Sequence, residues 1–223
     1  MLFRSLVSDE VLDLARREAR RIDVGKRPGR HGYRQGEIDA LLVDLARAGH
    51  RVVRLKGGDP FIFGRGGEEL EHLSRHGVPC EVVPGITAAS AAAAATGVPL
   101  THRGVAGAVT LLTGHAADGL PEHDWERLAT GGQTLALYMG VGHAAPIAER
   151  LIAGGLPAAT PVMVVENAST PRQRAVQGRL AGLADLLAEH AIKAPALVLI
   201  GEVAGLALGA EAGDGADRLA LAV

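Results

Sequence analysis

A glycine-rich turn at residues 57–60, with the sequence GGDP, is the stretch of this chain best suited to hold a ligand. Residues 52–55 before it (VVRL) have the apolar, β-branched character of a short buried strand. Glycine and proline end a strand, and glycine lets the backbone approach a ligand closely. Residues from 68 onward have the pattern of a helix. A strand, a glycine turn and a helix in succession place a ligand at the carboxyl end of a parallel strand.

Two other stretches carry groups that can bind anions. Residues 84–87 (PGIT) precede an alanine-rich helix expected at residues 88–96, and the free N–H groups of a helix start can meet a ligand. Thr87 there has the alternative role of a simple N-cap. Residues 25–31 (GKRPGRH) form a basic loop that can face carboxylates or can lie in solvent as an ordinary surface turn.

Several kinds of site are excluded by spacing. The nine histidines form no H-E-x-x-H or other metal-binding spacing, so we expect no metal. Gly64, Gly66 and Gly67 do not give the dinucleotide fingerprint, and Ser90 is not in a G-x-S-x-G elbow. The single cysteine, Cys80, excludes a disulfide framework, and we expect it in a buried strand as a core residue.

Composition limits the class of protein. The 223 residues are 48% hydrophobic and 22% charged, which suits a packed core. A net charge of -2, no basic stripe and only 3% aromatic residues argue against nucleic acid as a partner. No apolar run is long enough to span a bilayer, and one cysteine favours a reducing cytoplasm.

Strand and helix patterns alternate along the chain, which predicts an α/β fold. Two domains are expected, at residues 1–106 and 107–208, followed by a flexible tail at 209–223. Helices are predicted at residues 8–20, 35–48, 88–96, 144–153 and 180–189, and strands at 22–24, 52–55, 81–83, 109–112, 134–138, 162–165 and 196–200.

The run at residues 51–69 (RVVRLKGGDPFIFGRGGEE), with VVPGITAAS at 82–90 and PLTHR at 99–103, resembles the tetrapyrrole methylase family. Within the family it is most similar to the enzymes that methylate uroporphyrinogen III. The resemblance implies two small α/β domains with S-adenosylmethionine between them, a homodimer, and C-methylation of uroporphyrinogen III to precorrin-2 for sirohaem or cobalamin. Such a methyl transfer needs alignment, desolvation and a nearby acid or base, with no metal.

The resemblance assigns cofactor contacts to Gly57, Gly58, Asp59, Ile62, Thr87, Ala88, Met139, Ala168 and Ala196. The glycine backbone can hold the amino-acid portion of S-adenosylmethionine, and Asp59 can hold a cationic or hydroxyl group. Ile62 and Met139 can pack against the adenosine. Met139 has the simpler alternative of a core residue at a strand end. Ala168 stands where the family usually has glycine, and its methyl group can crowd the ligand.

The resemblance also points to substrate contacts. Lys26 matches the lysine that the family assigns as proton donor, with a solvated loop lysine as the alternative. Arg27, His31 and Arg103 are candidates for binding the acetate and propionate groups of the tetrapyrrole, because guanidinium and imidazolium groups pair with carboxylates.

The chain departs from the family pattern at its start. The family's first strand, GxGPGDP turn and helix have no counterpart, so we expect an incomplete first domain. The family's proton-accepting aspartate aligns with Arg4, and a guanidinium cannot accept a proton. Two alternatives therefore stay open: a precorrin methyltransferase acting at another ring carbon, and a catalytically impaired protein that binds S-adenosylmethionine or a tetrapyrrole.

Overall fold

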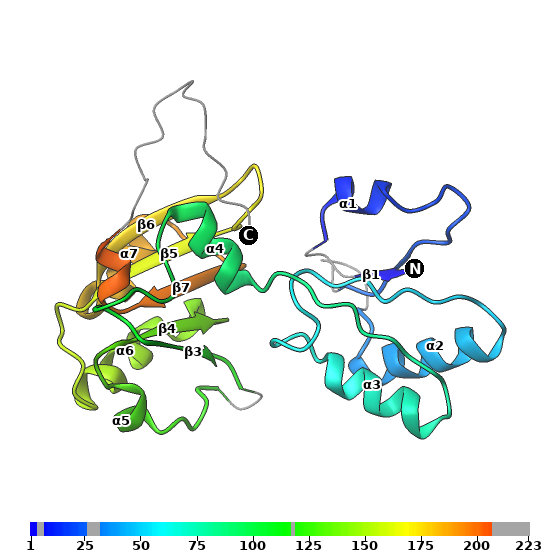
Figure 1. The fold of residues 1–223 in the computed structure, drawn as a ribbon, viewed down its shortest axis with the longest axis horizontal. Coiled ribbons are helices and arrows are strands. Elements are labelled where there is room, and N and C mark those ends of the chain that lie inside the picture. The colour runs from blue at the N-terminus through cyan, green and yellow to red at the C-terminus, as the bar shows by residue number, and fades with distance from the viewer. Residues whose placement is uncertain (4–6, 26–31, 117–118, 207–223) are drawn as a thin grey trace. The chain divides into compact units, whose positions relative to one another are not determined.

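A computed structural model describes residues 1–3, 7–25, 32–116 and 119–206 of the chain. The chain divides into two compact units, Met1–Thr87 and Ala88–Val223 (Figure 1). This division falls earlier than the boundary expected near residue 106. The reason is the helix α4 (Ala88–Thr96), whose Ala89 and Ala92 are fully buried in a core cluster of the second unit. The predicted tail at 209–223 lies outside the described residues.

The first unit is built on a short parallel sheet. Strands β1 (Leu2–Phe3) and β2 (Ile22–Asp23) pair in parallel, so the predicted strand near residue 22 is confirmed. On its other side Leu2 exchanges hydrogen bonds with Val53 and Leu55, each 2.8 Å, through a parallel bridge to Arg54. The segment at 52–55 therefore pairs with β1 through a single bridge and leads directly into the glycine turn, but it forms no strand of its own and Val53 is 49% exposed, so the predicted buried strand is only partly confirmed.

Helices α2 (Gln35–Arg47) and α3 (Gly66–Arg75) lie side by side in the first unit (Figure 1). Helix α1 (Asp9–Asp13) is shorter than the helix expected at 8–20, because Leu12 is its only buried residue and Leu14, which follows it, is 85% exposed. A short helix without packing is only marginally stable. The core of the unit consists of Leu2, Val24, Ile38, Leu42, Val43 and Leu73.

Two predictions for the first unit are wrong. Residues 81–83 form no strand and pair with no other segment among the described residues, and Val83 is 74% exposed. Cys80 is exposed and so is not a core residue. An apolar, β-branched run becomes a strand only where a neighbouring strand takes its backbone hydrogen bonds, and sequence pattern does not reveal that neighbour.

The second unit has a mixed five-stranded sheet in the order β3-β4-β7-β5-β6. Strands β3 and β4 are parallel, whereas the pairs β4–β7, β7–β5 and β5–β6 are antiparallel. The strands are β3 (Ala108–Thr113), β4 (Gln133–Tyr138), β5 (Pro161–Glu166), β6 (Arg174–Arg179) and β7 (Ala196–Ile200). The helices are α4, α5 (Trp125–Leu128), α6 (Ala144–Ala153) and α7 (Leu183–Glu189), with short 3-10 turns η1 (Val141–His143), η2 (Leu180–Gly182) and η3 (Glu202–Gly205).

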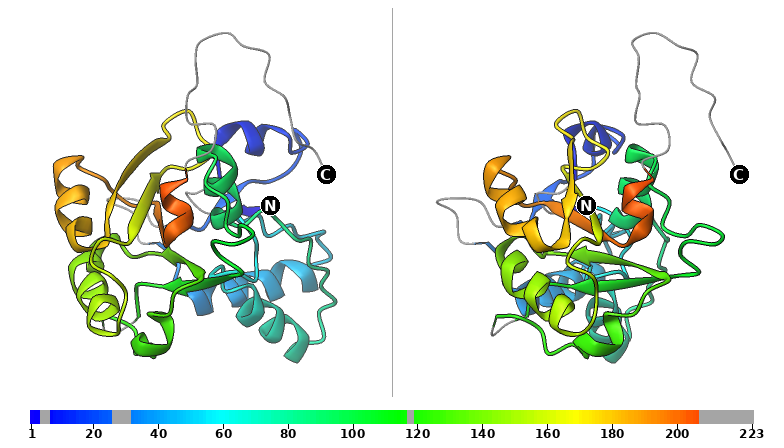
Figure 2. Two further views of the ribbon diagram at one scale, coloured as in Figure 1. Left: turned by 60° about the vertical axis from the view of Figure 1, so that its left-hand side comes forward. Right: turned by 90° about the vertical axis from the view of Figure 1, so that its left-hand side faces the viewer.

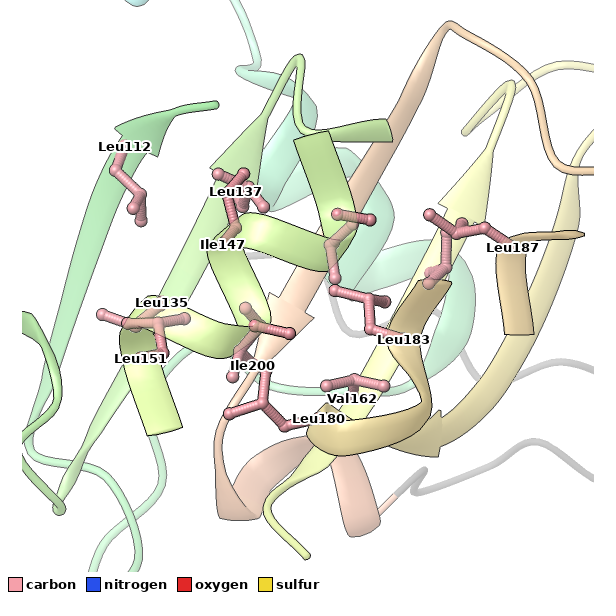
Figure 3. Packing of buried hydrophobic residues seen from close by; sticks show 14 of the residues in the cluster. Leu112, Leu135, Leu137, Ile147, Leu151, Val162, Leu180, Leu183, Leu187 and Ile200 are labelled. Atoms are coloured by element: carbon pink, nitrogen blue, oxygen red, sulfur yellow. The ribbon is translucent and has the colours of Figure 1, made fainter. Parts of the chain in front are cut away.

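Alternate residues of the central strands serve two separate cores. In β4, Leu135 and Leu137 join the core beneath α6 and α7, whereas Ala136 joins the core beneath α4 and η3. Strands β5 and β7 alternate in the same way, as the period of two in a strand requires. The result is a three-layer unit with helices on both faces of the sheet (Figure 2). Figure 3 shows the leucine-rich side, between the sheet, α6 and α7. No helix in the described ranges is long and apolar enough to cross a membrane.

Candidate cofactor-binding site

The glycine turn of the first unit is a tight, internally bonded loop between residue 56 and the start of α3. Its backbone turns through left-handed conformations at Gly58 (φ 87°), Phe63 (φ 50°) and Arg65 (φ 59°). The amide of Gly66 donates to the carbonyl of Pro60 at 2.9 Å, and a β-carbon at Gly66 would lie 2.4 Å from that oxygen. Only glycine allows this closure, and strained backbone of this kind gathers at ligand sites.

Asp59 joins this loop to residues 84–87. One carboxylate oxygen accepts a hydrogen bond from the amide of Gly85 at 3.0 Å, and the other accepts one from the amide of Phe61 at 2.8 Å. A β-carbon at Gly85 would lie only 2.5 Å from the carbonyl oxygen of Gly58. The two loops therefore touch, and they bring together five of the proposed contacts: Gly57, Gly58, Asp59, Ile62 and Thr87. Both oxygens of Asp59 bond to the protein itself, so the side chain orders the loops in addition to any ligand contact.

The hydrogen bond from the Gly85 amide, with a second from Phe61, lowers the pKa of Asp59 below its usual 3.8. A lowered folded-state pKa stabilises the fold above the unfolded pKa, and this contribution is lost as pH falls through the folded value. We therefore expect Asp59→Asn to lower the melting temperature at pH 7, because the NH2 group that replaces one carboxylate oxygen cannot accept a hydrogen bond, so only one of the Gly85 and Phe61 amides keeps its partner. The gap from wild type should close below pH 3.8. Thermal unfolding by circular dichroism measures this gap, and an equal gap at both pH values would contradict the assignment.

The proposed contacts of the second unit lie together at one edge of the sheet, namely the end at which β4 and β5 finish and β7 begins. Met139 follows the last residue of β4, and Ala168 lies two residues past the end of β5. Because β7 is antiparallel to both strands, its first residue, Ala196, pairs with Glu166 at the same edge. Ala88 begins α4, and the amide of the next residue donates to the hydroxyl of Tyr138 at 3.0 Å. The register therefore brings Ala88, Met139, Ala168 and Ala196 to this edge.

Left-handed backbone conformations occur at this edge of the sheet at Met139, Asn167 and Ser169. Met139 (φ 55°) and Asn167 (φ 49°) both have left-handed conformations directly after a strand, which is unusual for residues other than glycine. Met139 is 49% exposed, so its side chain is available to a ligand and is not a core residue. The exposed, strained position agrees with a ligand wall.

The buried carboxylate of Glu166 helps to fix the backbone of the loop before β7 to the loop after β5. Glu166, which is 5% exposed, accepts hydrogen bonds from Arg174 Nε at 2.6 Å and from the amide of Lys193 at 2.9 Å. The amide of Asn167 donates to the carbonyl of Pro195 at 2.9 Å. The Lys193 amide, followed by Arg174, holds the pKa of Glu166 below its usual value. The loop after β5 and the loop before β7 are thus fixed to each other.

Four candidates from the sequence remain: Lys26, Arg27, His31 and Arg103. Lys26, Arg27 and His31, together with Arg4, lie outside the described residues. Arg103 is exposed in the turn closed by the bridge between His102 and Ala106, which leads into the opposite, amino-terminal end of β3. In the part of the chain that the structure describes, no three histidine, cysteine or acidic side chains gather as metal ligands.

The positioning roles of Tyr138, Glu166 and Arg174 were not predicted from the sequence. The hydroxyl of Tyr138 accepts a hydrogen bond from the start of α4. In the sequence this role is indicated only by the position of Tyr138 next to Met139, a predicted cofactor contact. Glu166 and Arg174 pair across β5 and β6, but β6 itself was not predicted. Its residues are mostly exposed, as is usual for an edge strand, and none is buried. The apolar alternation that predicts a strand is therefore missing.

The chain matches the profile of the tetrapyrrole (corrin/porphyrin) methylases over residues 2–184. It is 53% identical over 207 residues to a siroheme synthase of Chromobacterium violaceum, covering 93% of this chain and 44% of that protein. It is 56% identical over 207 residues to siroheme synthase 1 of Yersinia enterocolitica, covering 92% of this chain and 43% of that protein. The chain therefore spans less than half the length of these curated relatives.

Solved structures with the same fold agree. The uroporphyrin-III C-methyltransferase of Thermus thermophilus, complexed with S-adenosyl homocysteine, is 43% identical with a TM-score of 0.78, over 92% of this chain and 86% of that one. A cobalt precorrin-4 methyltransferase is 29% identical with a TM-score of 0.79, over 91% of this chain and 84% of that one. By the family profile and by these relatives, the chain belongs to the tetrapyrrole methylase family.

Proposed function

We propose that this chain transfers methyl groups from S-adenosylmethionine to two ring carbons of uroporphyrinogen III, giving precorrin-2 for sirohaem or cobalamin. The observation that carries the proposal is the 43% identity to the Thermus thermophilus methyltransferase across 92% of the chain. The family profile and the similarity to siroheme synthases support it.

The geometry of each unit fits the cofactor. The exposed backbone of Gly57 and Gly58 offers polar groups of the kind that hold an amino-acid moiety, and Met139 offers an apolar wall. The cofactor supplies an electrophilic methyl group on its sulfonium. The work left to the chain is to align that group with a ring carbon and to exclude water, which positioned loops do well. Ala168 is half-buried and packs against the core cluster beneath α4, and its backbone is the proposed contact.

Substrate recognition is proposed for basic side chains. Lys26 is the proposed proton donor, and Arg27 and His31, which lie near it in the sequence, are proposed to pair with the carboxylates of the tetrapyrrole. Arg103 is the candidate that its position supports least, since its turn leads to the other end of β3 from Met139. Removing the charge of Arg27, His31 or Arg103 should raise KM for the tetrapyrrole and leave cofactor binding unchanged.

A second candidate reaction is methylation of a precorrin at another ring carbon. The 29% identity to a cobalt precorrin-4 methyltransferase, at a TM-score of 0.79, favours keeping it. A third is a protein that binds the cofactor or a tetrapyrrole without turnover, for which Arg4 at the position of the family's aspartate is the support.

One assay separates the three candidates. The chain is incubated anaerobically with methyl-labelled S-adenosylmethionine and, in separate reactions, with uroporphyrinogen III or a precorrin, and each product is analysed by mass and absorbance. We expect two labelled methyl groups per ring and the spectrum of precorrin-2. Label on a precorrin substrate only would favour the second candidate, whereas cofactor binding with no labelled product would favour the third.

A homodimer and a cytoplasmic location are also part of the proposal. Val83 and Ile86 are 74% and 73% exposed in the first unit, and exposed apolar side chains often mark interfaces. Light scattering of the purified chain should give twice the mass of 23.0 kDa. A monomer at micromolar concentration would contradict the dimer.

A further inference from the structure

A buried ionic cluster lies beneath the glycine turn. Glu69 in α3 is 4% exposed, and its carboxylate lies 2.9 Å from Lys56 Nζ and 3.2 Å from Arg54 Nε. The side-chain amide of Gln35 in α2 donates to Glu69 at 3.0 Å and also to Asp39, which is 8% exposed, at 2.8 Å. Two carboxylates and two cations are therefore buried together and balance in charge.

This cluster bonds directly to the loop. Lys56 immediately precedes the glycine turn, and its Nζ also donates to the carbonyl of Gly64 at 2.5 Å. The same ammonium group thus joins the entrance of the loop to its exit, while Glu69 fixes it from α3. Lys56 side-chain atoms are 12% exposed, so the bond to Gly64 is shielded from competing water.

Resting on the proposed function, we propose that Lys56, held by Glu69, is a positioning residue that sets the conformation of residues 57–64 for cofactor binding. The ordinary role of a buried ion pair is to neutralise charge, and that role requires no bond to the loop carbonyl. A flexible loop would have to be ordered when the cofactor binds, which lowers affinity. A loop already closed by Lys56 avoids that loss.

Two roles, positioning and charge balance, predict different results for a set of variants. Lys56→Met removes the bond to Gly64 and leaves one negative charge unbalanced. Adding Glu69→Gln restores the charge balance without restoring the bond, so the double variant should regain melting temperature but not affinity. We expect both variants to bind S-adenosylhomocysteine about tenfold more weakly than wild type, the effect of one shielded charged hydrogen bond.

Two controls separate stability from positioning. Leu73→Val trims a core side chain on the same helix and should lower the melting temperature by a few degrees with unchanged affinity. Glu71→Gln removes an exposed partner of Arg75 on α3 and should change neither quantity.

Hydrogen exchange in the ligand-free protein tests the loop without relying on the cofactor. The amide of Gly66, bonded to Pro60, should exchange faster in Lys56→Met and in the double variant than in wild type or Leu73→Val. Unchanged exchange and affinity in the two Lys56 variants would overturn the inference, as would an equal loss of affinity in Leu73→Val. If wild type failed to bind the cofactor, the proposed function would be contradicted, while the exchange rates would still test the loop.

Discussion

Replacing Gly85 with alanine is expected to weaken binding of S-adenosylhomocysteine by at least about tenfold, the equivalent of one strong hydrogen bond. The added β-carbon would lie 2.5 Å from the carbonyl oxygen of Gly58 and 3.1 Å from its carbonyl carbon. Both are backbone atoms, so the loops at 57–62 and 84–87 must move apart. That movement stretches the bond from the Gly85 amide to Asp59 and separates the five proposed contacts of the first unit. Calorimetric titration at pH 7 measures the change.

The matched control for Gly85→Ala is Gly36→Ala in α2 of the same unit. A β-carbon at Gly36 would meet nothing within 4 Å. Because alanine favours a helix over glycine, this variant should gain about 0.5–1 kcal/mol in free energy of unfolding with unchanged affinity. Full-strength binding by Gly85→Ala would show that close contact between the two loops is not needed for the cofactor.

Replacing Gly114 with alanine is expected to disturb both the stability and the binding edge of the second unit. The β-carbon would lie 2.6 Å from the Cα of Gly140 and 2.9 Å from a methyl group of Ile147. Overpacking of this kind costs about 1–3 kcal/mol in free energy of unfolding. Since Gly140 directly follows Met139, the loop after β4 must shift, and affinity for S-adenosylhomocysteine should fall as well.

Trp125 makes this prediction simple to measure. It is the single tryptophan and is buried in the leucine-rich core of the second unit, so its fluorescence follows unfolding of that unit. The control is Gly142→Ala, where the new β-carbon would meet nothing within 4 Å. A denaturation midpoint for Gly114→Ala equal to that of wild type would mean that the β3 and β4 ends have room to separate.

Sequence pattern predicted best those elements whose packing and boundaries are both local. The helices α4 and α6 and the strand β7 have the predicted limits, because apolar periodicity coincides there with clear breakers such as Gly97, Gly154 and Gly201. The alternation of β4, β5 and β7 between two cores also follows from the period of two. These elements carry the sheet edge that holds Met139 and Ala196.

The failures have a common physical cause. Whether residues 8–20, 81–83 and 174–179 form a helix or a strand depends on which other segments pack or pair with them. A single sequence does not reveal those neighbours. The same holds for the site. The GGDP turn and residues 84–87 were visible as motifs, but the carboxylate of Asp59 that joins them was not. The burial of Glu69 was not predicted either, since a glutamate in an amphipathic helix ordinarily faces solvent.

Calorimetric titration of the chain with S-adenosylhomocysteine tests the central claim most directly, namely that this chain binds the cofactor and that the glycine turn of the first unit takes part in the binding. We predict one site per chain with micromolar affinity for S-adenosylhomocysteine. This affinity should be lower in Gly85→Ala and unchanged in Gly36→Ala. No binding by a chain whose Trp125 fluorescence and circular dichroism show it to be folded would contradict the account.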